Sequence, residues 1–161
     1  MFNLKTEIYL RIIFLFSLIA LISAYLIEHV LGHQPCNLCL IERIPYGLSV
    51  MIIMAIFIIK KNQKFLVLLL ILTFIFSFVI SFYHFGIEQG FFQESSVCGV
   101  KSSTEIVTKE DLLKQLSEKT ISCRDVTFRI FGLSLTSINI FISLFFIITL
   151  LKIFNNYEKN K

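Results

Sequence analysis

The sequence predicts an all-α membrane protein built as a bundle of four spanning helices, and three observations carry that prediction. The 161 residues are 56% hydrophobic and their mean hydropathy is +0.80, which is too apolar for a soluble domain of this length. Four apolar runs approach the roughly 20 residues that a helix needs to cross a bilayer. Basic residues stand in small groups at the ends of these runs, as in membrane proteins. We therefore expect one domain over residues 1–161 and no nucleic-acid partner.

The four helices are expected at about 10–31, 40–59, 65–85 and 130–151. The first run could instead be a cleaved signal peptide, but it is long and no good small-x-small cleavage site follows it. The second run reaches spanning length only if its helix begins near Cys39 or Leu40. Pro45 then falls early in that helix, where a missing N–H costs least, although it could introduce a kink.

Small and polar side chains mark two helix faces for close packing. In the third run they recur every four residues, at Thr73, Ser77 and Ser81. Near the start of the fourth run they are Gly132, Ser134, Thr136, Ser137 and Asn139. Such residues let helices approach closely and hydrogen-bond across the interface, so we expect helix–helix contacts at both faces.

Positive charge sets the expected orientation. The short connection after the second run carries Lys60, Lys61 and Lys64 without an acid between them. Further basic residues flank the first helix and follow the last, namely Lys5, Arg11, Lys152, Lys159 and Lys161. By the positive-inside rule both termini are cytoplasmic, and the loops of about 32–39 and 86–129 lie outside.

All four cysteines then lie on the oxidising side of the membrane. The longer outer loop also contains a capping-box pattern at Thr108–Asp111, followed by leucines on one helical face. It predicts a short amphipathic helix that lies on the membrane or packs on the loop's own small core.

Cys36 and Cys39 form a Cys-x-x-Cys pair against the start of an apolar run. With Cys39 at the helix start and Arg43 one turn on, a thiolate at Cys39 would be stabilised by both. An inert disulfide is the alternative, but so short a loop gains little from being tied. Haem attachment would need a histidine directly after Cys39, where Leu40 stands.

Cys98 and Cys123 are a separated pair in the longer outer loop. A disulfide between them would close a loop of about 25 residues, worth about 3 kcal/mol, and for this pair alone a structural role is the better explanation. The other pair on the same side opens a second possibility, because neighbouring disulfides exchange by thiolate attack. A zinc site of four cysteines is disfavoured by the missing short spacing, so we expect no metal.

One histidine and the missing electron acceptor complete the analysis of the site. His84 lies near the outer end of the third run, either as a proton donor or ligand contact or simply as an interfacial side chain. The chain carries no flavin or haem motif, and a lipid-soluble quinone reached from the bilayer would suit a thiolate-plus-arginine site.

Several stretches resemble one family closely. They are Pro35–Cys39 with Glu42, Arg43, Pro45 and Tyr46; Tyr83–Gly90; the lone Cys98; and Cys123 followed by Phe131–Leu135 and Asn139. The family is that of the bacterial disulfide bond formation protein B (DsbB), in its alphaproteobacterial-like form. The resemblance covers nearly the whole chain. Vitamin K epoxide reductase-like proteins share the four-helix bundle and quinone chemistry but place these elements in the opposite order.

The resemblance implies an inner-membrane oxidoreductase that serves oxidative protein folding. It would reoxidise a periplasmic, thioredoxin-like DsbA-type partner and pass the electrons to ubiquinone or menaquinone. The resemblance also implies a role for each site residue. Cys98 matches the cysteine that the partner attacks, and Cys123 matches its mate, which exchanges with Cys36. Cys39 matches the cysteine that contacts the quinone. Arg43 matches the residue that stabilises this contact, and His84 matches a histidine beside the quinone. The rival hypothesis is a non-enzymatic membrane subunit with two structural disulfides.

Overall fold

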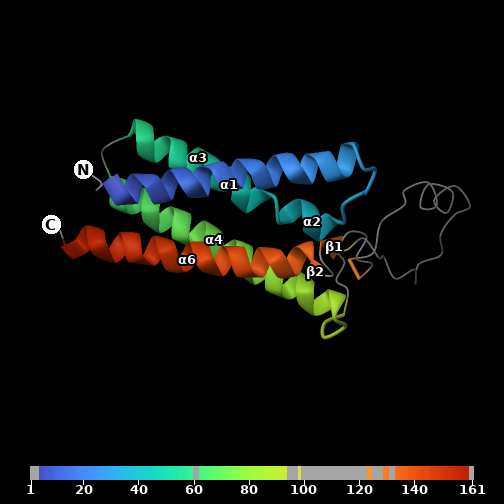
Figure 1. Ribbon diagram of the computed structural model, residues 1–161. Coiled ribbons are helices and arrows are strands. Elements are labelled where there is room, and N and C mark those ends of the chain that lie inside the picture. Colours follow the sequence, from blue (N-terminus) through green and yellow to red (C-terminus); the bar gives the residue numbers. More distant parts are fainter. Residues whose placement is uncertain are drawn as a thin grey trace, which may run out of the picture.

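Four long helices make up most of the computed structural model, which describes residues 4–59, 62–93, 98, 123–124, 129–130 and 133–159. The helices run side by side (Figure 1). They are α1 (Leu4–His29), α3 (Ile44–Ile58), α4 (Gln63–Glu88) and α6 (Leu135–Lys159), with the short α2 (Asn37–Ile41) before α3. An antiparallel hairpin of β1 (Arg129–Ile130) and β2 (Leu133–Ser134) precedes α6.

The helices have the length and surface of membrane spans. Within the described residues, four segments are long and apolar enough to cross a membrane: Thr6–His29, Asn37–Ile58, Gln63–Glu88 and Leu135–Asn156. Their outward faces carry large apolar side chains, among them Met51 and Phe141, which are 70% and 69% exposed. Lipid can cover such an apolar surface, whereas its exposure to water would cost free energy. The predicted all-α bundle of four spans is confirmed.

The bundle core lies where α4 meets its neighbours. α4 packs most extensively against α6 and also against α3, which in turn packs against α1. The fully buried ring of Phe74 stands edge-on to Tyr46 and Phe146, with ring centroids 6.3 and 5.0 Å away. These aromatic contacts tie α3, α4 and α6 together through one side chain.

The predicted polar packing faces meet one another between α4 and α6. Ser143 Oγ donates a hydrogen bond to Ser77 Oγ at 3.1 Å, and Asn139 Nδ2 donates to Ser81 Oγ at 2.7 Å. The prediction is therefore confirmed for Ser77, Ser81 and Asn139. Thr73 differs, because its hydroxyl donates to the carbonyl of Leu69 within its own helix.

The second span is broken rather than continuous from Cys39 or Leu40. α2 ends at Ile41, a turn follows at Glu42 and Arg43, and α3 begins at Ile44. Pro45 explains the break, since it has no N–H for the carbonyl of Ile41 and its ring crowds that carbonyl. The kink that the sequence allowed is thus a local break in the helical hydrogen bonds at Glu42 and Arg43, whose backbones keep right-handed helical dihedral angles.

The expected start of the fourth helix at about residue 130 is wrong. Residues 129–134 include the hairpin strands, and α6 begins only at Leu135. Ser134 sets this start, because its Oγ accepts a hydrogen bond from the backbone N–H of Ser137 at 3.2 Å, as a helix cap does. The amphipathic helix expected after Thr108 lies outside the described residues.

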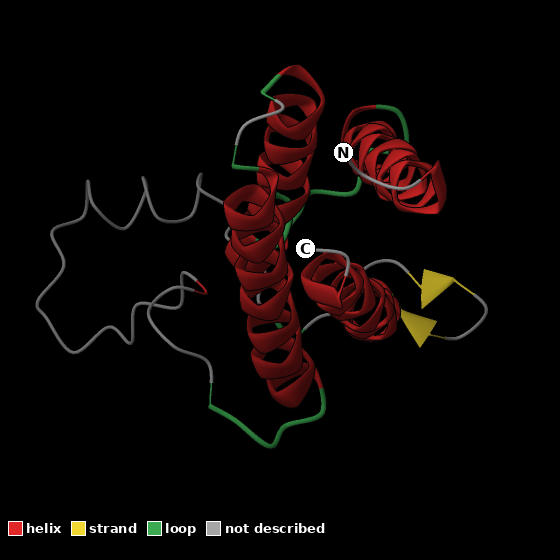
Figure 2. Cartoon of the chain, turned by 90° about the vertical axis from the view of Figure 1, so that its left-hand side faces the viewer, coloured by secondary structure: helices red, strands yellow, loops and turns green. Residues whose placement is uncertain are grey.

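The two ends of the bundle differ in what they carry. Both chain termini lie at one end, together with the connection from α3 to α4, while α2 and the hairpin lie at the other (Figure 1). Viewed from the end with the termini, the helices group around a common axis and the two strands stand to one side (Figure 2). The cysteine-bearing elements are therefore gathered at one end of the molecule.

Candidate functional site

α2 folds the Cys-x-x-Cys pair so that the two sulfurs have different surroundings. Cys36 is the N-cap of α2, and its Sγ accepts a hydrogen bond from the backbone N–H of Cys39 at 3.2 Å. Cys36 is only 6% exposed, whereas Cys39 is half-buried. The helix start therefore acts on the sulfur of Cys36, and the expectation that it acts on Cys39 is wrong.

The surroundings of Cys36 favour its thiolate. The hydrogen bond from the Cys39 side chain is the largest cause of a lowered pKa of Cys36, and burial opposes it. His84 adds to the lowering through a hydrogen bond and its charge, with Nε2 lying 3.6 Å from Cys36 Sγ. Together these contacts lower the pKa of Cys36 to about 4.

His84 is held by acids from two elements. Its Nδ1 lies 3.0 Å from Glu42 Oε1 in the α2–α3 turn, and its Nε2 lies 3.9 Å from Glu88 Oε1, one turn further along α4. The ring is almost fully buried. Glu88 Oε1 also accepts a hydrogen bond from Thr136 of α6 at 2.7 Å. The ring thus connects Cys36 to two buried carboxylates.

The second cysteine pair lies against the first. Cys98 and Cys123 are buried in one cluster with Cys36, Leu38 and Ile87. Burial, followed by a hydrogen bond with Cys98, raises the pKa of Cys123, while a hydrogen bond from the Leu38 backbone opposes the rise. The structure therefore brings all four predicted cysteines together, with His84 in contact with Cys36.

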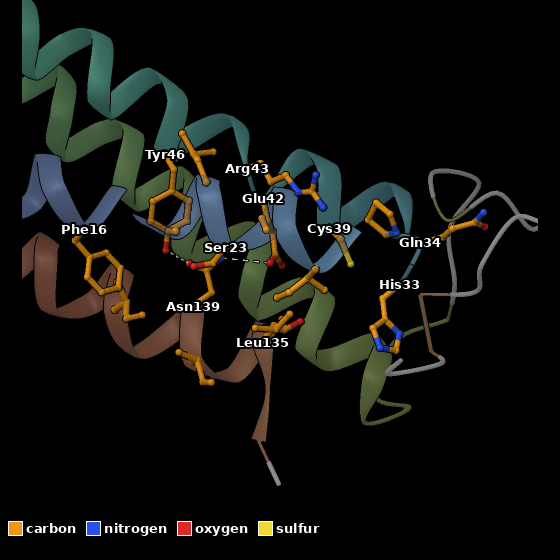
Figure 3. Close-up of a pocket in the computed structure, with 18 residues that line it drawn as sticks. Phe16, Ser23, His33, Gln34, Cys39, Glu42, Arg43, Tyr46, Leu135 and Asn139 are labelled. Carbon is orange, nitrogen blue, oxygen red and sulfur yellow. Dashed lines mark hydrogen bonds between the residues drawn. The ribbon is translucent and has the colours of Figure 1, made fainter. Parts of the chain in front are cut away.

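Cys39 borders a cavity of about 260 Å³ that lies among α1, the α2–α3 turn and α6. Glu42, Arg43, Tyr46 and Asn139 give it a polar edge, and Figure 3 shows Glu42 and Arg43 between Cys39 and the pair formed by Tyr46 and Asn139. Most of the remaining wall is apolar and comes from α1 and α6: Phe16, Ala20, Leu21, Ala24, Ile27, Leu135, Ile138 and Ile142. Neither Cys36 nor His84 lines this cavity.

Arg43 lies one turn beyond Cys39, as its spacing predicts. It stands in the turn between α2 and α3, where the backbones of Glu42 and Arg43 keep right-handed helical dihedral angles. Both Cys39 and Arg43 line the same cavity. The Arg43 guanidinium donates through Nη1 to Glu28 Oε2 of α1 at 2.5 Å, which ties the turn to the outer end of α1.

Sequence reasoning missed the roles of Glu28 and Glu42. Glu42 links His84, through Oε1, to Asn139, whose Nδ2 donates to Glu42 Oε2 at 3.3 Å. Tyr46 in turn donates to Asn139 Oδ1. The available signal was an acid within or at the end of an apolar run, since ionisable groups at such positions are rarely without a partner.

These features define a class of protein. A Cys-x-x-Cys pair in contact with a second thiol pair, on a bundle of four apolar spans, is the arrangement of a multi-pass membrane protein of thiol–disulfide chemistry. Residues 6–153 match the family of the disulfide bond formation protein DsbB, and the chain belongs to this family. It is thus a membrane protein of disulfide bond formation.

The chain is also similar to an uncharacterised protein over most of its length. The chain is 31% identical over 136 residues to "Uncharacterized protein RP370" of Rickettsia prowazekii (strain Madrid E). The aligned part covers 83% of this chain and 79% of the relative. The similarity agrees with the alphaproteobacterial-like form that the motifs resemble.

Proposed function

We propose that the protein is a thiol–quinone oxidoreductase, which reoxidises a periplasmic DsbA-type dithiol oxidase and passes two electrons to membrane quinone. One observation carries the proposal. Cys36, the N-cap of α2, packs with the second cysteine pair, while Cys39 in α2 packs against the same cluster and also borders the cavity. A disulfide between them would thus have one sulfur on the side of thiol exchange and one on the side of the acceptor.

The cavity suits the head group of ubiquinone or menaquinone. Its apolar wall comes from α1 and α6, which make few contacts with each other, and this leaves a route from the bilayer. Its polar edge offers the Arg43 guanidinium and the half-buried Cys39 sulfur. When bound, the quinone supplies the two-electron acceptor, and Arg43 would balance the negative charge of a Cys39 thiolate.

Four thiol–disulfide exchanges carry the electrons from the partner to Cys36 and Cys39. The partner's thiolate attacks Cys98, and resolution of that mixed disulfide leaves Cys98 and Cys123 reduced. Cys123 then attacks Cys36 and displaces the Cys39 thiolate toward the cavity. Cys98 attacks Cys123, restores their disulfide and releases Cys36. The lowered pKa of Cys36 assists this last step, because a sulfur of low pKa leaves readily.

His84 and Glu42 would stabilise the thiolate of Cys36. His84 Nε2 is 3.6 Å from Cys36 Sγ, and its Nδ1 pairs with Glu42 Oε1. The ring, oriented by the carboxylate, can therefore hydrogen-bond to the Cys36 thiolate that the last exchange releases. This assigns His84 to Cys36, whereas the family resemblance implied a position beside the quinone.

Energetics and charge support the partner and the location. DsbA-type partners have potentials near about −120 mV, so only an acceptor well above that value can keep them oxidised, and quinone meets this need. The clustered lysines at the end opposite the cysteines favour an inner-membrane protein with its redox residues on the periplasmic side.

The test is anaerobic reduction of quinone by the purified protein, supplied with a reduced DsbA-type partner. We expect wild type and Thr73→Ala, a control whose hydroxyl bonds only within α4, to turn over. Cys39→Ser and Cys98→Ser should abolish turnover. If quinone is untouched and all four cysteines resist reduction, the protein is instead a membrane subunit with structural disulfides.

A further inference from the structure

Cys36, Cys39 and His84 form a cluster of metal-ligating side chains. Their ligand atoms all lie within 4.8 Å of one another, and the cluster is largely buried. Two sulfurs on one tetrahedral zinc ion stand about 3.8 Å apart, and a sulfur and an imidazole nitrogen stand about 3.6 Å apart. The 3.6 Å from Cys36 Sγ to His84 Nε2 already meets the second of these spacings.

The surroundings of His84 match those of a metal-ligating histidine. Such a histidine usually donates its other ring N–H to a carboxylate, which fixes the ring and raises its basicity. Here His84 Nδ1 lies 3.0 Å from Glu42 Oε1, so Nε2 is the nitrogen directed toward the sulfurs. Asn139 Nδ2 holds the second oxygen of Glu42 in turn.

We propose that the reduced protein binds one thiophilic divalent cation, such as Zn²⁺, through Cys36 Sγ, Cys39 Sγ and His84 Nε2. Two thiolates and a neutral imidazole neutralise the ion's charge and leave one position for water. Binding releases the thiol protons and forms no sulfur–sulfur bond. It excludes the disulfide, so the ion selects the reduced form and holds it out of thiol exchange. This site differs from a four-cysteine zinc site because it uses neither Cys98 nor Cys123.

The experiment is a Co²⁺ titration of the full-length, detergent-solubilised protein, reduced and freed of reductant under anaerobic conditions. We expect one Co²⁺ per chain, with cobalt–thiolate charge-transfer absorption and the visible bands of tetrahedral cobalt, and displacement by Zn²⁺. The oxidised protein should give no such spectrum. Because the experiment measures metal binding, its result tests the metal site independently of whether the protein reduces quinone.

Variants distinguish this site from others. Cys39→Ser and His84→Gln should weaken Co²⁺ binding at least tenfold, and Glu42→Gln should weaken it by about 10- to 100-fold. The double variant Cys98→Ser/Cys123→Ser should bind one equivalent as wild type does. Unchanged binding in His84→Gln or Cys39→Ser overturns the proposal, as does loss of binding in the double variant. Thermal unfolding of each variant identifies any that lost binding because it misfolded. For such a variant, the proposal is tested instead on wild type, where bound zinc should protect Cys36 and Cys39 from alkylation.

Discussion

The sulfurs of Cys36 and Cys39 are three positions apart in the chain but belong to different environments. Cys36 caps α2 and faces His84 and the second cysteine pair, whereas Cys39 faces the cavity. The four cysteines and Arg43 could be proposed as site residues from their types and spacing. Which sulfur caps the helix could not be predicted, because a shift of a few residues in the helix start exchanges the two roles.

The pH dependence of Cys36 gives a first prediction. In Cys98→Ser/Cys123→Ser, which leaves only Cys36 and Cys39, the pKa of Cys36 lies well below that of an ordinary thiol. One thiolate should therefore persist at neutral pH and disappear only as the pH falls toward about 4. His84→Gln should raise this midpoint, but the hydrogen bond from Cys39, the larger cause, should keep it below about 8.5. Ultraviolet thiolate absorbance during a pH titration checks both statements, and a midpoint that does not move in His84→Gln contradicts the role of the ring.

A second prediction concerns Gly86, near the end of α4. Phe91 and Phe92 donate their backbone N–H groups to the Gly86 carbonyl at 2.8 and 3.2 Å, and Phe92 stacks on Tyr83 with ring centroids 5.7 Å apart. A Cβ on Gly86 would overlap the Phe92 ring. Gly86→Ala should therefore lower stability by about 1–3 kcal/mol, the usual cost of overpacking.

A double-mutant cycle isolates that contact. Thermal unfolding of the solubilised protein should show the loss for Gly86→Ala alone and much less of it when Phe92→Ala is also present, since the ring is then gone. Equal losses in both backgrounds would mean that the overlap with Phe92 is not the cause.

At the scale of the elements, the helix ends were the least predictable feature. Apolar runs locate a helix, but its ends depend on single hydrogen bonds. Pro45 divides the second span because it has no N–H to donate to the carbonyl of Ile41. Ser134 starts α6 because its Oγ accepts a hydrogen bond from the backbone N–H of Ser137. Ser77 and Ser81 were predictable because their spacing alone puts them on one helix face.

The break at Pro45 yields a third prediction. Pro45→Ala restores an N–H that can bond to the Ile41 carbonyl, so α2 and α3 can join into one helix. Glu42 and Arg43 would then be displaced relative to their partners His84 and Glu28. We expect higher helicity by circular dichroism and a loss of quinone reduction of about tenfold or more, because small displacements of positioned groups are costly. Gly47→Ala is a matched control in the same helix, where an added Cβ meets nothing within 4 Å. Unchanged activity with increased helicity would show that the turn is not required.

At the scale of the whole molecule, hydropathy and charge were sufficient for the architecture. A bilayer permits few folds, so four apolar runs of spanning length define a four-helix bundle. The ion pairs of Glu28 with Arg43 and of Glu42 with His84 could not be predicted from the sequence, because each pair joins residues from different elements. Such contacts depend on helix rotation, which apolar runs that face lipid on several sides leave undetermined.

A fourth prediction tests the orientation. In a background with the four native cysteines replaced by serine, Gln34→Cys and Asn62→Cys place a single thiol at opposite ends of the bundle. A membrane-impermeant maleimide added to spheroplasts should label the first variant and should label the second only after the membrane is permeabilised. The reverse pattern would invert the proposed orientation.

Cys36 packs with the second cysteine pair while Cys39 borders the cavity, and this division has a kinetic consequence. Under the proposed function, the protein substrate and the lipid-soluble substrate do not compete for one space, so neither must depart before the other arrives. Raising the concentration of either should saturate the rate without inhibiting access of the other. Electrons would then pass from an aqueous compartment to a lipid compartment through Cys36 and Cys39, at the start of a five-residue helix, while both substrates stay bound.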